Sequence, residues 1–187
     1  QIYDEKKQAI QREATEIDPE YQTISKGEYR HFMEKEIYEQ PQAILNTLDG
    51  RVGGDDVRDD IFGIGSSKLL EKVKRIQIVA CGTSLHAGRV ASNWLSAIAG
   101  IPTQVDYASE YRYRNPHVDE DSLLVTISQS GETADTIAAL RYAKEKDYLS
   151  TISICNVPTS SLARESDFFL YTNAGPEVGV ASTKAFS

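Results

Sequence analysis

The sequence contains little cysteine and no long apolar run. Cys81 and Cys155 are the only cysteines among 187 residues, too few for a disulfide-stapled fold or a cysteine-rich metal site. No apolar stretch approaches the ~20 residues that a membrane-spanning helix requires, and no signal peptide is recognisable. These absences predict a reduced, cytoplasmic protein without a membrane partner.

Basic residues are also scarce. The chain has 20 lysines and arginines against 28 aspartates and glutamates, a formal net charge of −8 at pH 7, and its basic residues form no patch. This argues against a nucleic-acid partner, which would require a concentrated positive surface. Apolar residues make up 40% of the chain, enough for the core of a single globular domain.

One stretch, residues 123–136, combines a buried strand with a cluster of hydroxyl side chains. It opens with a short apolar run typical of a buried strand, and apolar spacing from Ala134 onward indicates a helix. Between them lie Ser128, Gln129, Ser130, Gly131 and Thr133. A tight strand-to-helix turn brings backbone N–H groups and the positive helix end to one point, and hydroxyls add donors that suit phosphate oxygens. The stretch therefore predicts an anion site.

Serine and threonine before a helix are also common N-caps, and this pattern alone fits capping better than phosphate binding. A second strand–hydroxyl–helix turn changes the balance. Residues 76–80 form another apolar run, which is followed by Cys81, Gly82, Thr83 and Ser84 and then by a helical pattern. In a parallel sheet, two such turns place two polar helix starts along the same carboxyl edge, where α/β sheets bind ligands.

Short apolar runs alternate with helical patterns along most of the chain. Strands are predicted at residues 76–80, 103–107, 123–127, 149–155 and 167–171. Strands separated by helices form parallel sheets with helices on both faces. We therefore expect an α/β fold: a three-layer α/β/α sandwich with a parallel sheet of about five strands.

The ends of the chain differ from this central pattern. Residues 1–27 are polar and charged and predict a linker, the tail of an upstream domain, whereas residues 28–187 predict the domain itself. An apolar face that includes Ile37 predicts a first helix, and Pro41 fits the first turn of a second. The last residues, 174–187, predict a loop that leads into a helix.

The stretch after the second helix, residues 49–60, is rich in aspartate. These aspartates lack the spacing of an EF-hand loop, so no metal site is predicted.

Four motifs together resemble a known domain family. They are CGTS at 81–84, SQSGET at 128–133, ICNVP at 154–158 and EVGVASTKAF at 177–186. They resemble the sugar isomerase (SIS) domain and, more narrowly, the first of the two SIS domains in the glutamine–fructose-6-phosphate aminotransferase family. The helical segment 27–41 resembles the same family, in which it follows a glutaminase domain. The resemblance covers nearly the whole chain.

The resemblance implies part of an enzyme of hexosamine biosynthesis that needs no cofactor. Such an enzyme takes ammonia from glutamine, passes it to fructose 6-phosphate and isomerises the adduct to glucosamine 6-phosphate. The residues that the resemblance assigns to the phosphate are Ser128, Gln129, Ser130 and Thr133, with Thr83 and Ser84 from the neighbouring turn. Those that it assigns to the sugar are Val180 and Ser182.

Parts of the family pattern have no counterpart in this sequence. The first cysteine is Cys81, so the nucleophilic N-terminal cysteine of the glutaminase half is absent, and the family's isomerase base lies beyond the first SIS domain. Proton transfer between sugar carbons C1 and C2 needs a positioned base. Glu132 is interpreted as first-turn charge that complements a helix dipole, Glu177 as at best adjacent to the site, and Lys184 as a structural partner for a carboxylate. No catalytic residue is therefore predicted.

We expect the chain to bind sugar phosphate without full catalysis, with a glutaminase domain and a second SIS domain of the same protein as partners and with a homodimer as its assembly. Two alternatives stay open. The chain could be a stand-alone SIS module that senses sugar phosphates for a regulator, or a deglycase that acts on fructosamine phosphates with the same phosphate turn. A reading frame that ends here would favour the sensing module, and a different substrate profile would favour the deglycase.

Overall fold

The computed structural model describes residues 2–3, 9–10, 24–54 and 56–187. Two short antiparallel pairs lie outside the main sheet: β1 (Ile2–Tyr3) with β2 (Ala9–Ile10), and β3 (Val52–Gly53) with β4 (Asp56–Val57). Most of the predicted linker, residues 1–27, lies outside the described residues. Among the helices of the described ranges, none combines the length and the apolar character needed to cross a lipid bilayer.

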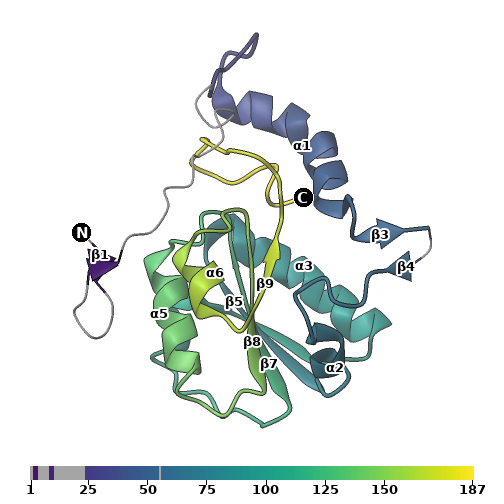
Figure 1. Ribbon diagram of the computed structural model, residues 1–187, viewed down its shortest axis with the longest axis vertical. Coiled ribbons are helices and arrows are strands. Elements are labelled where there is room, and N and C mark those ends of the chain that lie inside the picture. The colour runs from purple at the N-terminus through teal and green to yellow at the C-terminus, as the bar shows by residue number, and fades with distance from the viewer. Residues whose placement is uncertain (1, 4–8, 11–23, 55) are drawn as a thin grey trace.

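Five parallel strands form the central sheet (Figure 1). They are β5 (Arg75–Ala80), β6 (Thr103–Tyr107), β7 (Ser122–Ser128), β8 (Ser150–Cys155) and β9 (Phe168–Tyr171). Their order is β6-β5-β7-β8-β9, so the chain crosses from β5 to one edge and then builds the other side strand by strand. Ala80 is paired with both Tyr107 and Ile127, which aligns the carboxyl ends of the first three strands. The predicted α/β fold with a five-stranded parallel sheet is confirmed.

Helices cover both faces of this sheet. One face carries α4 (Ala108–Tyr111), α5 (Ala134–Ala143) and α6 (Ser161–Glu165), and the other carries α2 (Ser66–Leu70) and α3 (Gly82–Ile98) (Figure 1). On the first face, Leu124 and Leu140 are fully buried, so truncation of either to alanine would cost about 2–5 kcal/mol of stability. On the second, a Cβ at Gly88 of α3 would meet Ile78 Cγ2 at 2.8 Å. Close packing of this kind sets the distance between α3 and the sheet.

The N-terminal helical region is a single helix, α1 (Phe32–Leu48), and the prediction of two helices separated at Pro41 is wrong. Proline has no N–H, so the carbonyl of Ile37 loses its usual helical partner. The side chain of Gln40 donates to that carbonyl at 3.1 Å, which lets the helix continue. The predicted apolar face is also wrong, because Ile37 is 47% exposed whereas Glu36 is buried.

Residues 172–187 form an irregular segment that runs between α1 and the sheet (Figure 1). The predicted loop is confirmed, but the segment contains no helix. Side chains of α1 contact it at both ends: Thr47 donates to the carbonyl of Thr172, and Gln40 accepts a hydrogen bond from the Ser187 hydroxyl at 2.7 Å. A polar segment thus packs against the polar face of α1, which is why the apolar face of this helix points outward.

Candidate functional site

The carboxyl ends of β5 and β7 form the topological switch point of the sheet. β5 leads into α3 on one face and β7 leads into α5 on the other, so the two connections diverge from this edge. A pocket of about 430 Å³ lies there, between the two turns and the loop 177–182. The structure brings together all eight residues that the sequence predicts as ligand contacts. The pocket is lined by Thr83, Ser84, Ser128, Gln129, Ser130, Thr133, Val180 and Ser182, among others.

Hydrogen bonds inside the turn after β7 hold its hydroxyl groups in place. The Ser128 hydroxyl accepts a hydrogen bond from the Gly131 amide at 3.1 Å and lies 3.1 Å from the Thr133 hydroxyl. The Ser130 hydroxyl accepts from the Glu132 amide, also at 3.1 Å. Three hydroxyls are therefore positioned before any ligand arrives, which reduces the entropy lost on binding.

Gly131 lets this turn pack tightly against the start of α6. Its φ is +66°, a conformation that other residues adopt only with strain, and a Cβ there would meet Ser160 Oγ at 2.1 Å. The Gly131 carbonyl also accepts a hydrogen bond from the Leu162 amide at 3.2 Å. The turn is thus held by α6 on one side and by its own hydroxyls on the other.

Neither helix that begins at the pocket has a side-chain cap. Cys81 at the start of α3 and Thr133 at the start of α5 make no side-chain hydrogen bond to the first turn. The first amides of a helix have no partner within the helix, and the macrodipole makes that end positive. Capping by Thr133, the alternative interpretation of the sequence, does not occur, since its hydroxyl pairs with Ser128. Two uncapped helix starts beside the hydroxyl turn can hold an anion without a lysine.

The third wall of the pocket is the loop 177–182. The Glu177 carboxylate accepts hydrogen bonds from the Ser182 hydroxyl at 2.8 Å and from the Thr183 amide at 2.6 Å. Val180 is fully exposed at the mouth of the pocket. Glu177 therefore lies at the pocket, but its carboxylate is already hydrogen-bonded to neighbouring residues of its own segment.

The position of Glu132 corrects a sequence-based expectation. Its carboxylate accepts hydrogen bonds from the amide and the hydroxyl of Ser161, at 2.7 and 2.8 Å. These bonds lower the pKa of Glu132, so it stays ionised. Glu132 caps the start of α6, and the prediction that it complements the dipole of α5 is wrong. α5 is the nearest helix in sequence, but the fold brings the start of α6 within reach of the Glu132 carboxylate.

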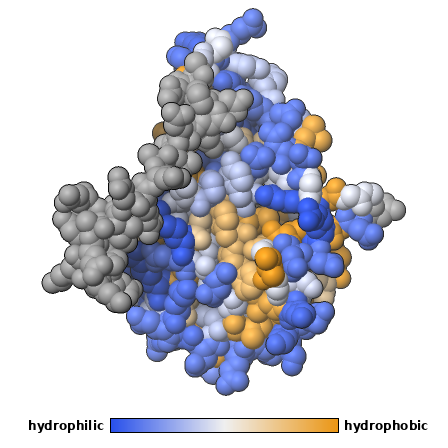
Figure 2. Space-filling model, viewed as in Figure 1, coloured by the Kyte–Doolittle hydropathy of each residue, from blue (hydrophilic) through white to orange (hydrophobic). Residues whose placement is uncertain are grey.

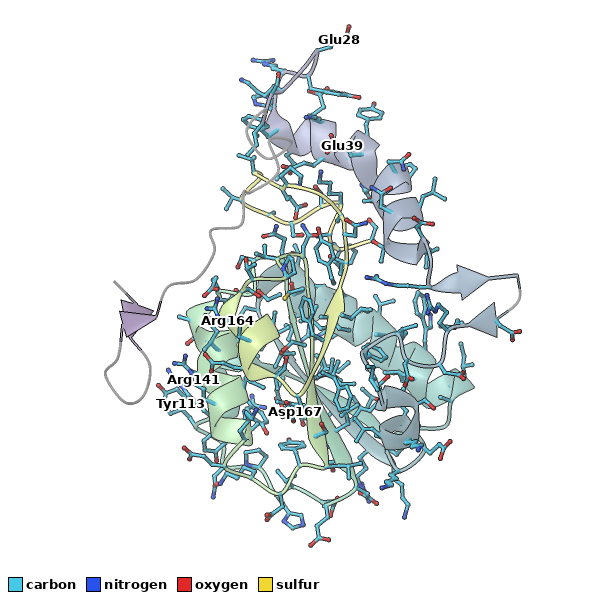
Figure 3. The ribbon with its side chains drawn as sticks, in the orientation of Figure 1. Glu28, Glu39, Tyr113, Arg141, Arg164 and Asp167 are labelled. Carbon is cyan, nitrogen blue, oxygen red and sulfur yellow. The ribbon has the colours of Figure 1, made fainter. Side chains whose placement is uncertain are left out.

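Lys184 has the structural role predicted for it. Its ammonium group donates to Glu39 Oε2 at 2.6 Å, and the Lys184 side chain is only 6% exposed. Figure 3 shows Glu39 on α1, next to the C-terminal segment that carries the lysine. In the described part of the chain, the residues that line the pocket include no lysine or arginine. The donors that an anion could use there are therefore backbone amides and hydroxyl groups.

Sequence reasoning missed Glu36 and Gly179, which bring α1 to the pocket. Glu36 is 2% exposed and contacts the loop at Gly179, which lines the pocket. Glu36 lies seven residues before Ala43 and so shares its helix face. That face is the buried one, since Glu36 and Ala43 are the buried residues of α1.

Comparison with known proteins gives consistent matches. A model of the SIS domain matches residues 69–187. The whole chain is 56% identical to glutamine–fructose-6-phosphate aminotransferase of Pseudomonas aeruginosa and 54% identical to that of Vibrio parahaemolyticus, but it spans only 30% of the length of each. The C-terminal domain of glucosamine-fructose-6-phosphate aminotransferase from Francisella tularensis has a TM-score of 0.83 at 52% identity, covering 87% of this chain and 45% of that chain. Since the domain model matches well over half of the sequence, the chain belongs to the SIS domain family.

Proposed function

We propose that this chain is the sugar-phosphate-binding domain of an enzyme that makes glucosamine 6-phosphate from fructose 6-phosphate and glutamine. The observation that carries the proposal is the pocket at the switch point, where a turn rich in hydroxyls meets two uncapped helix starts. The names of relatives more than 50% identical to the chain supply the substrate. A phosphate dianion matches this set of donors.

In this proposal the ligand lies across the pocket. Its phosphate accepts hydrogen bonds from the turn after β7 and from Thr83 and Ser84 at the start of α3. Its sugar carbons point toward the loop that carries Val180 and Ser182. This orientation follows from the chemistry of the lining, because the hydroxyl turn is the most donor-rich wall and the loop is the more mixed one.

The proposed role of this part of the protein is binding without complete catalysis. Proton transfer between C1 and C2 needs a base within hydrogen-bond reach of the carbon-bound proton. Both glutamates near the pocket are engaged, Glu177 with its own loop and Glu132 with α6. We propose that residues 28–187 form the first SIS domain, and that a second SIS domain and a glutaminase domain in the longer protein supply the base and the ammonia. The chain spans 30% of the curated relatives, which leaves room for both.

Calorimetric titration with fructose 6-phosphate tests the proposal. We expect saturable binding of fructose 6-phosphate, weaker binding of inorganic phosphate and no binding of fructose, since the phosphate contributes the charged hydrogen bonds. A chain that binds fructose as well as fructose 6-phosphate would contradict the phosphate-directed site. A chain that binds none of the three would contradict the claim that this domain forms its site alone.

A double substitution tests the assignment of the turn. Ser130→Ala with Thr133→Ala removes two hydroxyl donors, each worth about 1.5–3 kcal/mol to a charged acceptor, so the affinity for fructose 6-phosphate should fall about 100-fold or more. The melting temperature should stay within a few degrees, because the buried core is untouched. Ser92→Ala with Ser96→Ala, two hydroxyls of α3 away from the pocket, is the matched control and should bind normally. Unchanged affinity in the first variant would refute the assignment.

We also propose that the protein works as a homodimer in a reducing, cytoplasmic compartment. Support for association comes from α3, where the large apolar side chains Trp94 and Ile98 are 63% and 83% exposed. Both cysteines are free, as a reducing compartment requires.

A further inference from the structure

Glu36 of α1 is a buried carboxylate whose partners are backbone amides of the pocket loop. Its Oε1 atom accepts hydrogen bonds from the Val178 amide at 2.6 Å and from the Gly179 amide at 2.9 Å. The side chain is only 2% exposed. A buried ionised carboxylate is costly unless it is well hydrogen-bonded, so these contacts depend on each other: the loop satisfies the carboxylate and the carboxylate holds the loop.

The loop is shaped to admit this carboxylate. A Cβ at Gly179 would meet Glu36 Oε2 at 2.4 Å, so glycine is the residue that allows the close approach. A second contact follows along the same helix, where Glu39 accepts from Lys184 at 2.6 Å. Acidic side chains one helical turn apart thus hold the loop near its start and the chain two residues after its end.

The turn after β7, residues 128–133, is the proposed phosphate turn, and other parts of the fold hold it. Its Gln129 carbonyl accepts from the Asn156 amide at 3.0 Å and its Gly131 carbonyl from the Leu162 amide at 3.2 Å, partners that belong to the loop after β8 and to α6. Among the described residues, the hydrogen bonds of this turn involve no residue of α1. The pocket therefore has two walls with different direct supports, one for each end of the proposed ligand, and α1 contacts only the wall made by the loop.

We propose that Glu36 is a positioning residue for sugar recognition: it holds the loop 177–182 at the distance from the phosphate turn that a hexose phosphate spans. This inference rests on the proposed function, because it assigns the sugar end of the same ligand to this loop. Loss of the carboxylate frees the loop and weakens contacts to the sugar, while the phosphate turn keeps its geometry. Glu36 does not touch the ligand.

The experiment compares Glu36→Gln and Glu36→Ala with the wild type and with Glu34→Gln. Glu34 is an exposed glutamate on the same helix, so its substitution makes the same change in charge away from the loop. Amide exchange measured by NMR without ligand reports on the loop directly. We expect the Val178 and Gly179 amides to exchange about tenfold faster or more in both Glu36 variants, and at the wild-type rate in Glu34→Gln.

Titration of the same proteins by NMR then separates a positioning role from a merely structural one. Fructose 6-phosphate should bind about tenfold more weakly to Glu36→Ala, and inorganic phosphate should bind as it does to the wild type. A general loss of structure would weaken both ligands together. If Glu36→Ala fails to fold, Gly179→Ala serves as the second variant. Its added Cβ displaces the Glu36 carboxylate, so the Val178 amide should again exchange faster.

Each contrary result has a distinct meaning. Wild-type exchange rates at Val178 and Gly179 in the Glu36 variants would overturn the inference, because the carboxylate would not be holding the loop. Faster exchange with an unchanged ratio of the two affinities would overturn it as well, since the loop would then not select the sugar. If the wild type binds inorganic phosphate but shows no preference for fructose 6-phosphate, the proposed function fails and the sugar-positioning role with it, while the exchange rates still decide whether Glu36 anchors the loop.

Discussion

Cys81 and Cys155 occupy two different environments. Cys155 ends β8, is 1% exposed, and burial raises the pKa of its thiol despite weak hydrogen bonds to its neighbours. Cys81 is partly exposed and lines the pocket. Because alkylation requires an accessible thiolate, the two should react very differently in the folded protein.

We therefore expect iodoacetamide to label Cys81 in the native protein and Cys155 only after unfolding. Fructose 6-phosphate should slow the labelling of Cys81 severalfold by occupying the pocket, and fructose should not. Mass spectrometry of tryptic peptides over a time course measures both effects. Equal labelling rates for the two thiols would contradict the difference in burial. A Cys81 labelling rate that fructose 6-phosphate does not change would mean that the sugar phosphate does not bind in this pocket.

The residues of the pocket differ in how far the sequence reveals them. Ser128 and Thr133 could be predicted because a strand-to-helix turn is local, so its chemistry can be inferred from a few consecutive residues. Glu36 could not, since its hydrogen bond to Gly179 joins residues 143 positions apart. Which face of α1 meets the loop depends on the packing of the whole domain.

At the level of elements, Asp167 connects the starts of two neighbouring strands. It lies just before β9 (Figure 3). Its carboxylate accepts hydrogen bonds from the amide and the hydroxyl of Thr151 in β8, at 2.9 and 2.8 Å, and from Lys144 at 3.1 Å. Burial on its own would raise the pKa of Asp167, but the hydrogen bonds from Thr151 and Lys144 outweigh it and lower the pKa. The ionised form therefore stabilises the fold.

The sign of the pH dependence follows. A carboxylate whose pKa is lowered by folding stabilises the protein fully above its ordinary pKa of about 3.9, and this contribution is lost as the pH falls through the lower pKa of the folded state. We expect Asp167→Asn to cost about 1 kcal/mol at pH 7, because the side chain is 41% exposed and solvent screens part of the interaction. The difference from the wild type should shrink below about pH 4.

Urea unfolding of both proteins at several pH values measures this difference. Asp147→Asn is the matched control, since Asp147 is an exposed aspartate in the loop before β8 and its replacement makes the same change in charge. A penalty for Asp167→Asn that grows as the pH falls would contradict the lowered pKa. A penalty equal to that of Asp147→Asn at pH 7 would show that the link between the strands contributes nothing.

Elements were predictable where one physical signal dominates. The five strands are short apolar runs bounded by polar turns, and each occurs within a few residues of its predicted position. The sequence predicts two helices in place of α1, because a proline such as Pro41 normally interrupts the hydrogen-bond ladder. The Gln40 side chain supplies the hydrogen bond that the Ile37 carbonyl loses at the proline. Helix propensities do not predict such a single side-chain contact.

For the molecule as a whole, an apolar groove marks the face of the sheet that carries α3. Figure 2 shows a hydrophobic area in the middle of the view, bordered by hydrophilic residues. A groove of about 500 Å³ between α3 and strands β5, β7 and β8 has an entirely apolar lining, which includes Trp94 and Ile98. Removal of this apolar surface from water favours association.

We expect the chain to associate through this face, so that its mass in sedimentation equilibrium rises toward that of a dimer as the concentration increases. Trp94→Lys should keep the protein monomeric, because a charge on the groove cannot be buried without a partner. Asn93→Lys adds the same charge at the preceding residue of α3, which is exposed and outside the groove, and this variant should associate as the wild type does. A wild-type mass that stays monomeric at every concentration would contradict the proposed homodimer, and loss of association in both variants would show that net charge, rather than the groove, controls it.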